Sequence, residues 1–195
     1  DEMIPLFERY PESRFWIDEA YVQYVDPDRH QPFSDLVPRF DNLVVSRTFS
    51  FAYGMASLRV GYLLGNPALV KTLGDQLTDY RIGGLAERLA VAALEDPEHL
   101  PFMRQFCKEQ RSFLRQGMGD LAGVETFDSD TNFILCRFTD GRKAAALYDA
   151  MLEKGVKIKI FKPFGELHHD TYFRLTFGTP EENAFMLEKL REILG

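Results

Sequence analysis

The chain has 195 residues, of which 45% are hydrophobic and 13% aromatic, which is enough for one or two domains with a buried core. Its 30 acidic and 23 basic residues give a formal net charge of -7, which argues against a nucleic-acid partner. No stretch approaches the roughly 20 apolar residues of a membrane span. Two cysteines, Cys107 and Cys136, are too few for a disulfide framework or a zinc ribbon, and the pair His168-His169 has no third metal ligand in its pattern. We therefore expect a cytoplasmic chain without a metal site.

Three short apolar runs in the first half of the chain predict buried strands. They cover residues 14–17, 42–46 and 60–64. The residues between them, 26–41 and 47–57, are rich in turn-forming or small side chains and are predicted to be loops. Because the runs are continuous rather than alternating, they are typical of an α/β protein whose sheet is covered on both faces.

Helical patterns follow, and then a smaller region of mixed strands and helices. The predicted helices are 67–78, 85–94, 98–117, 141–154 and 180–194, and the predicted strands are 131–137, 157–161 and 172–177. The last helix has a clear start, with Thr179 as its N-cap and Glu182 three residues later. We divide the chain into a first domain of residues 1–95 and a second domain of residues 96–195.

Three charged residues at or within apolar runs are candidates for a binding site. Asp18 ends a buried strand, where an acidic side chain either caps a turn or helix or belongs to a ligand site. Arg174 lies between Phe173 and Leu175, so it requires a partner, either a protein carboxylate or a bound anion. Arg59 also has apolar neighbours, so we expect it to be buried and to bind an anion, with a surface salt bridge as the alternative.

Four segments, in this order, resemble one protein family. They are Asp18 to Tyr21 after the first strand, Ser46 to Tyr62 around the second loop, Thr131 to Phe133 at the start of a strand, and Phe173 to Asn183 near the end. Together they extend over nearly the whole chain. The chain resembles the C-terminal half of fold-type-I, pyridoxal-phosphate-dependent aminotransferases of the histidinol-phosphate aminotransferase type.

The resemblance implies a fold, a cofactor and an activity. Residues 1–95 would be the C-terminal part of the large cofactor-binding domain, with a mostly parallel sheet covered by helices, and residues 96–195 the small α+β domain. The family exchanges an amino group between an amino acid, or its phosphate-ester analogue, and a 2-oxo acid. It forms homodimers with active sites near the subunit boundary, so these small molecules and a second chain are the expected partners.

The resemblance also assigns roles to the cofactor-binding residues. Asp18 would hold the proton of the cofactor's ring nitrogen through a charge-assisted hydrogen bond. Tyr21 would donate to the ring oxygen, although a packed core tyrosine is the alternative. Thr48, Ser50 and Arg59 match the positions that bind the cofactor phosphate, for which the planar guanidinium is well suited.

For the substrate, Arg174 matches the arginine that binds the α-carboxylate, and Asn132 is a further candidate for the same pocket. Three lysines, Lys157, Lys159 and Lys162, lie in or beside the strand near residue 160. They form either a solvated face or, as in relatives with phosphorylated substrates, a place for a phosphate.

The chain departs from the family pattern at the position of the catalytic lysine. The family motif has lysine between Ser50 and Ala52, and this chain has Phe51. That lysine carries the cofactor as a Schiff base and moves a proton between substrate and cofactor, and a phenyl ring does neither. The nearest lysine, Lys71, is 20 positions away on a predicted helix. Three explanations of Phe51 are open. It is a change made by engineering or by an error in recording the sequence, or the protein is a natural pseudoenzyme, or the protein binds the cofactor non-covalently for another purpose.

The family's N-terminal half would precede Asp1 and would supply part of the cofactor cradle and further strands of the large sheet. Because open strand edges favour association, we expect either a fragment of a longer molecule or a chain that pairs with another. We expect this chain alone to be inactive. Two other functions compete: a non-catalytic partner or regulatory module that kept the fold, and a cofactor-dependent decarboxylase or lyase.

Overall fold

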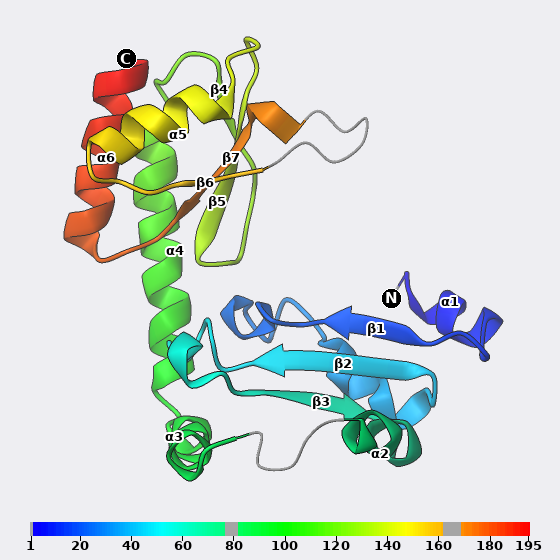
Figure 1. Cartoon of the computed structure of the whole chain (residues 1–195). Coiled ribbons are helices and arrows are strands. Elements are labelled where there is room, and N and C mark those ends of the chain that lie inside the picture. The colour runs from blue at the N-terminus through cyan, green and yellow to red at the C-terminus, as the bar shows by residue number, and fades with distance from the viewer. Residues whose placement is uncertain (1, 77–81, 162–168) are drawn as a thin grey trace. The chain divides into compact units, whose positions relative to one another are not determined.

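The computed structural model describes residues 2–76, 82–161 and 169–195 (Figure 1). The chain divides into an N-terminal unit, Asp1–Arg104, and a C-terminal unit, Gln105–Gly195. The division falls within helix α4 (His99–Met118), C-terminal to the boundary that we predicted, so the assignment of large and small domains stays a prediction. The predictions for Lys162 and for the pair His168-His169 fall on or beside residues outside the described part of the chain.

A three-stranded sheet in the order β1-β2-β3 forms the centre of the N-terminal unit. Strands β1 (Phe15–Asp18) and β2 (Leu43–Thr48) are parallel, whereas β3 (Gly61–Gly65) is antiparallel to β2. The three predicted strands are present and the α/β class is confirmed. One of the two pairs differs from the parallel arrangement that we expected for most of this sheet, because residues 49–60 join β2 to β3 without an α-helix that crosses over the sheet.

One face of this sheet packs against two elements that we did not predict. They are α1 (Ile4–Arg9) and the 3-10 helix η2 (Phe33–Arg39), which lies in the stretch predicted to be a loop. The most buried members of the cluster are Phe7, Leu36, Leu43 and Val45. Burial of these side chains therefore holds the N-terminal segment and η2 on the same side of β1 and β2.

Two helices follow β3, as predicted. Helix α2 (Pro67–Asp75) begins at its proline, and the side chain of Asn66 caps it. Helix α3 (Gly84–Glu95) packs against the loop that follows β2, through a cluster whose buried members are Phe49, Val60, Ala86 and Ala90. The small residues of α3 thus help to position the loop that contains Phe51.

The C-terminal unit is a four-stranded antiparallel sheet in the order β4-β5-β7-β6. Its strands are β4 (Val124–Thr126), β5 (Phe133–Phe138), β6 (Lys159–Ile160) and β7 (Tyr172–Thr176), and its helices besides α4 are α5 (Ala144–Glu153), α6 (Pro180–Leu194) and the 3-10 helix η4 (His169–Thr171). This α+β arrangement agrees with the predicted second region, except that β4 was not predicted.

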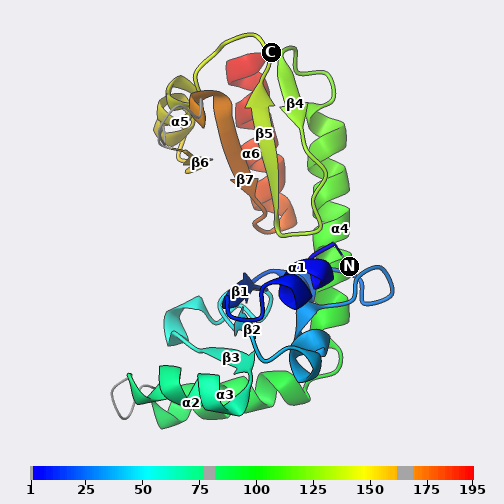
Figure 2. The same ribbon diagram turned by 90° about the vertical axis from the view of Figure 1, so that its right-hand side faces the viewer.

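The helices α4, α5 and α6 share one core with one face of this sheet. Residues of β5 and β7 alternate between buried and partly exposed positions, so every second side chain enters the core. The fully buried members include Leu114, Ile134, Met151, Phe173 and Leu190. Helix α6 lies beside α4 (Figure 2). Between these helices, the guanidinium of Arg191 donates two hydrogen bonds to the carbonyl of Gly117.

Within the described residues, no helix combines the length and the apolar character that crossing a membrane requires. The same part of the chain contains no group of three His, Cys, Asp or Glu side chains arranged to hold a metal ion.

The predicted start of the last helix can be tested through its N-cap. The hydroxyl of Thr179 accepts a hydrogen bond from the backbone N–H of Glu182, whose carboxylate accepts one from the backbone N–H of Thr179. We expect Thr179→Ala to lower the free energy of unfolding by about 1 kcal/mol, because a helix N–H loses its acceptor. Thr179→Ser keeps the hydroxyl and should remain within about 0.5 kcal/mol of the parent chain.

Two thiols in the C-terminal unit provide the measurement. Cys107 and Cys136 are free and buried, and burial raises their pKa values to about 11 and about 12, so neither reacts with a thiol reagent while this unit is folded. The urea concentration at which these thiols begin to be labelled should be lower for Thr179→Ala than for the parent chain. It should be unchanged for Thr179→Ser. Equal shifts for both variants would contradict the capping role.

Candidate functional site

Polar side chains lie at the ends of the two parallel strands of the N-terminal unit. Asp18 is the last residue of β1 and Thr48 the last residue of β2. Asp18 is in register with Ser46, and Thr48 follows two positions later, so all three side chains belong to the same face of the sheet. Because the carboxyl ends of parallel strands are the usual ligand-binding edge of an α/β sheet, this is the candidate site.

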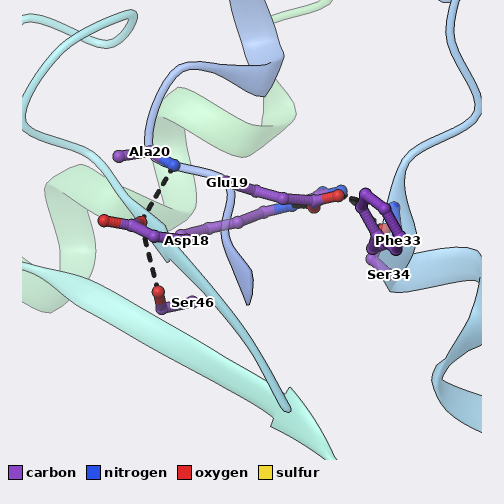
Figure 3. A network of polar contacts seen from close by, with 7 residues as sticks. Asp18, Glu19, Ala20, Phe33, Ser34 and Ser46 are labelled. Carbon is purple, nitrogen blue, oxygen red and sulfur yellow. Dashed lines mark hydrogen bonds and ion pairs between the residues drawn. The ribbon is translucent and has the colours of Figure 1, made fainter. Parts of the chain in front are cut away.

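The carboxylate of Asp18 is held in place through one of its two oxygens. Its Oδ1 accepts hydrogen bonds from the backbone N–H of Ala20, at 3.1 Å, and from the hydroxyl of Ser46, at 3.2 Å (Figure 3). The Ser46 hydroxyl accepts in turn from the indole N–H of Trp16, at 3.0 Å. No donor among the described residues reaches Oδ2 of Asp18. The carboxylate is therefore oriented by the protein and retains an acceptor for a ligand N–H.

A buried ion pair lies beside Asp18 and joins β1, β2 and η2. Oε2 of Glu19 is 2.9 Å from Nε and 2.8 Å from Nη2 of Arg47, and its Oε1 accepts from the backbone N–H of Phe33 at 2.5 Å. The guanidinium of Arg47 also donates to the hydroxyl of Ser34 at 2.5 Å. Burial alone would lower the pKa of Arg47, but its bonds to Glu19 and Tyr62 outweigh this and the pKa is raised. Figure 3 shows Glu19 pointing toward η2 and Asp18 toward Ser46.

The residues after Asp18 and after Thr48 lie in loops with several internal hydrogen bonds. The hydroxyl of Thr48 donates to Oγ of Ser50 at 2.9 Å and accepts from the backbone N–H of Ser50 at 3.0 Å. Both residues are half-buried. A paired set of hydroxyls beside a backbone N–H is suited to an anion such as a phosphate.

Arg59 differs from our expectation. We expected a buried guanidinium, but Arg59 is exposed, and its Nη1 donates to the carbonyl of Ala56 at 2.9 Å. It is the one non-glycine residue among those described with a left-handed backbone, with φ of 56°. This turn ends the 3-10 helix η3 (Ala56–Leu58) and leaves the neighbouring Val60, instead of Arg59, in the core. A left-handed backbone costs free energy at a non-glycine residue, and residues of this kind occur most often at functional sites.

Phe51 stacks on Tyr21. The two ring centroids are 4.4 Å apart with an interplanar angle of 8°, and Tyr21 stacks on Tyr24 at 6.3 Å. The Phe51 side chain is nevertheless 37% exposed. Lys71 is the only lysine of the N-terminal unit, and it forms an ion pair with Asp75 at 2.6 Å within α2. An aromatic ring thus occupies the position where the resemblance places the catalytic lysine.

Hydrogen bonds to the carbonyl groups on both sides of Phe51, and to its own carbonyl, hold the backbone of this loop in place. Gly54, with φ of 69°, donates its N–H to the carbonyl of Phe51 at 2.9 Å, and Met55 donates to the carbonyl of Phe49 at 3.0 Å. The ring of His99, at the start of α4, lies 2.8 Å from the carbonyl oxygen of Ala52. The orientation of Phe51 is therefore set by the loop and by α4.

In the C-terminal unit, Arg174 lies on the sheet face opposite the helices. It is partly buried, and its guanidinium is 4.6 Å from the ring centroid of Phe133. Its Nε is buried without a hydrogen-bond partner among the described residues, so no carboxylate in that part of the chain pairs with this nitrogen. Asn132 lies just before β5, where its carbonyl accepts from the N–H of Phe177 at 2.9 Å. Lys157 and Lys159 are both exposed.

Several residues that shape the site were not among our candidates. They are Trp16, Glu19, Ser46, Arg47 and His99. Glu19, Ser46 and Arg47 lie inside the segments that carry the resemblance, where polar residues next to a buried strand require partners, and this could have indicated their pairing. Trp16 and His99 act through contacts between distant segments, which the sequence alone does not reveal.

The chain thus combines an α/β unit, which has an acidic group and hydroxyls at its parallel strand ends, with an α+β unit in which one buried arginine nitrogen has no hydrogen-bond partner among the described residues. A comparison with protein families makes this specific. The family model of class I and II aminotransferases matches residues 2–190, so the chain belongs to the class I and II aminotransferase family.

Individual relatives agree with this assignment. The histidinol-phosphate aminotransferase of Symbiobacterium thermophilum is 36% identical over 191 residues, which cover 96% of this chain and 50% of that protein. The crystal structure of L-threonine-O-3-phosphate decarboxylase from Porphyromonas gingivalis is 27% identical, with a TM-score of 0.84 over 99% of this chain and 58% of the other. The chain spans about half the length of the curated relatives it matches.

Pyridoxal phosphate is the cofactor of this family. The crystal structure of histidinol-phosphate aminotransferase from Sinorhizobium meliloti contains it. That protein is 23% identical to this chain, with a TM-score of 0.86 over 99% of this chain and 52% of the other. The side chains of this site suit the two groups of the cofactor that bind without a covalent bond, the ring nitrogen and the phosphate. The free Oδ2 of Asp18 is an acceptor for a protonated ring nitrogen, and the hydroxyls of Thr48 and Ser50 suit its phosphate. Phe51 does not suit its aldehyde, because the phenyl ring has no amine.

The contribution of the buried ion pair can be measured by removing one partner. We expect Glu19→Ala to lower the free energy of unfolding by about 3 kcal/mol, because Arg47 then remains partly buried without a counter-charge. Trp16 is the sole tryptophan and lies on β1, so its fluorescence in urea reports on this unit. The exposed Glu12→Ala is the control, with a change within about 0.5 kcal/mol. If both variants changed stability equally, the ion pair would not be what holds β1 to β2 and η2.

Proposed function

We propose that this chain supplies the C-terminal half of a pyridoxal phosphate site of the aminotransferase type, binds the cofactor non-covalently, and does not turn over by itself. The observation that supports it best is the position of Asp18 and Thr48, on one face at the ends of two adjacent parallel strands. Family membership adds the chemical identity of the ligand.

Each candidate residue has one task in this proposal. When bound, the cofactor supplies an electron sink for bonds at the α-carbon of an amino acid. Asp18 accepts the N–H of the ring nitrogen, and Tyr21 is the candidate donor to the ring oxygen. The hydroxyls of Thr48 and Ser50 donate to the phosphate, and the exposed guanidinium of Arg59 neutralises its charge.

Arg174 is the proposed residue for the α-carboxylate of the substrate, because its buried Nε needs an anionic or polar partner. Asn132 is proposed for the same pocket. Phe51 supports the statement on turnover, since a phenyl ring accepts no proton from the α-carbon and forms no bond with an aldehyde. The substrates of the complete protein are then an amino acid, or its phosphate ester, and a 2-oxo acid.

A further chain segment is part of the proposal. The chain spans about half the length of its relatives, and β1 is an edge of its sheet, with its residue Trp16 59% exposed. We propose that the other half of the family fold, in the same or another polypeptide, covers this edge, and that the complete protein is a homodimer in the cytoplasm.

A second candidate function is decarboxylation, favoured by the 27% identity with a decarboxylase. In this cofactor family the orientation of the substrate decides which bond at the α-carbon breaks, and Arg174 would set that orientation in either case. Incubation with pyridoxal phosphate and amino acids distinguishes the two reactions, since one yields a 2-oxo acid and the other carbon dioxide. The absence of both products, together with cofactor binding, is the outcome that our first proposal predicts.

The proposal is tested by titrating the chain with pyridoxal phosphate in a calorimeter, then adding borohydride and measuring the mass. We expect saturable, reversible binding and an unchanged mass. A mass increase located at Lys71 or another lysine would contradict non-covalent binding. No heat of binding at any concentration would contradict the site itself and favour a purely structural or regulatory module.

The role of Asp18 predicts the effect of one substitution. We expect Asp18→Asn to weaken pyridoxal phosphate binding about 10- to 100-fold, because a neutral amide replaces a charged acceptor of the ring N–H. Asp28→Asn, in an exposed position of the same unit, makes the same chemical change away from the site and should leave the affinity unchanged. Equal affinities of the parent chain and Asp18→Asn would remove Asp18 from the site.

A further inference from the structure

We infer that this site discriminates among the forms of its cofactor, and that it binds the amine form, pyridoxamine 5'-phosphate, in preference to the aldehyde form. The inference rests on the proposed function and concerns the carbon of the cofactor that carries the aldehyde or amine. The residue that decides it is Phe51.

A lysine at position 51 would favour the aldehyde, because it condenses with an aldehyde, with loss of water, and does not condense with an amine. The N-terminal unit lacks such a group, since its only lysine, Lys71, is ion-paired with Asp75 on α2. The aldehyde therefore loses its covalent advantage. A lysine ammonium would also repel a second ammonium beside it, and Phe51 removes that repulsion.

The aromatic rings add an attraction for a cation. Phe51 lies parallel to Tyr21, with an interplanar angle of 8°, and Tyr21 stacks in turn on Tyr24, so three rings form one stack. The 37% exposure of Phe51 leaves this stack accessible at its end. The primary amine of the cofactor is protonated at neutral pH, as lysine is, and the face of an aromatic ring attracts such a cation. The neutral aldehyde gains nothing comparable.

The experiment compares three forms of the cofactor that differ only at this carbon: the amine, the aldehyde and the alcohol pyridoxine 5'-phosphate. Their dissociation constants are measured by calorimetry on the whole chain. The alcohol is the neutral control for the amine. We expect the amine to bind about two- to fivefold more tightly than the alcohol, and the aldehyde and the alcohol to bind about equally.

Two variants of Phe51 separate its contributions. Phe51→Leu keeps an apolar side chain without a ring, so the amine should lose its advantage over the alcohol. Phe51→Lys should reverse the preference: the aldehyde becomes the tightest ligand, and borohydride reduces its C=N bond to the lysine and fixes the cofactor mass on residue 51. The matched control Phe113→Leu, at an exposed position of α4, should leave all three affinities unchanged.

Each outcome has a distinct meaning. If the aldehyde binds the parent chain as tightly as the amine or more tightly, or is trapped by borohydride, the inference is wrong while the proposed cofactor site stands. Equal affinities of amine and alcohol would also overturn it. If none of the three binds, the proposed function fails and the inference fails with it.

Discussion

The buried ion pair between Glu19 and Arg47 is the interaction on which the N-terminal unit depends most. It joins the end of β1 to β2, and through Phe33 and Ser34 it holds η2 against both strands. Removing two charges from water is unfavourable unless their remaining hydrogen bonds are satisfied, and these contacts satisfy them. Because Glu19 points to this network, its neighbour Asp18 is left to face the other side, where Ser46 and the N–H of Ala20 orient it. In our proposal, two adjacent carboxylates therefore have different roles: Glu19 stabilises the fold and Asp18 binds the cofactor.

We propose that Phe51 stands at the position of the family's lysine, in a loop that hydrogen bonds and a ring contact hold in place. The loop that contains it keeps its hydrogen bonds to the residues around Gly54 and to His99, and the ring finds a stacking partner in Tyr21. Under our proposal the site therefore lacks a nucleophile and a base at position 51, while Asp18, Thr48 and Ser50 bind the rest of the cofactor. A site of this kind binds through hydrogen bonds, charge and ring contacts alone, so its selectivity follows from those forces.

Much of this arrangement follows from sequence pattern. The strands of the N-terminal unit, the helices α3 and α6, and the cap at Thr179 were predicted closely, because continuous apolar runs and capping residues act locally. The position of Asp18 at a strand end was also correct. The 3-10 helix η2 was missed because its formation depends on burial of Leu36 against β2, and the exposure of Arg59 because a left-handed turn overrides its apolar neighbours. The bonds of Trp16 to Ser46 and of His99 to Ala52 join distant segments and are visible only in the folded chain.

The most direct test of this account is a crystal structure of the chain grown with pyridoxal phosphate. We expect the ring nitrogen within hydrogen-bond distance of Asp18, the phosphate on the hydroxyls of Thr48 and Ser50, and no covalent bond between the cofactor and the protein. A cofactor bound elsewhere on the chain, or one joined to Lys71, would contradict the assignment of the site and the role of Phe51.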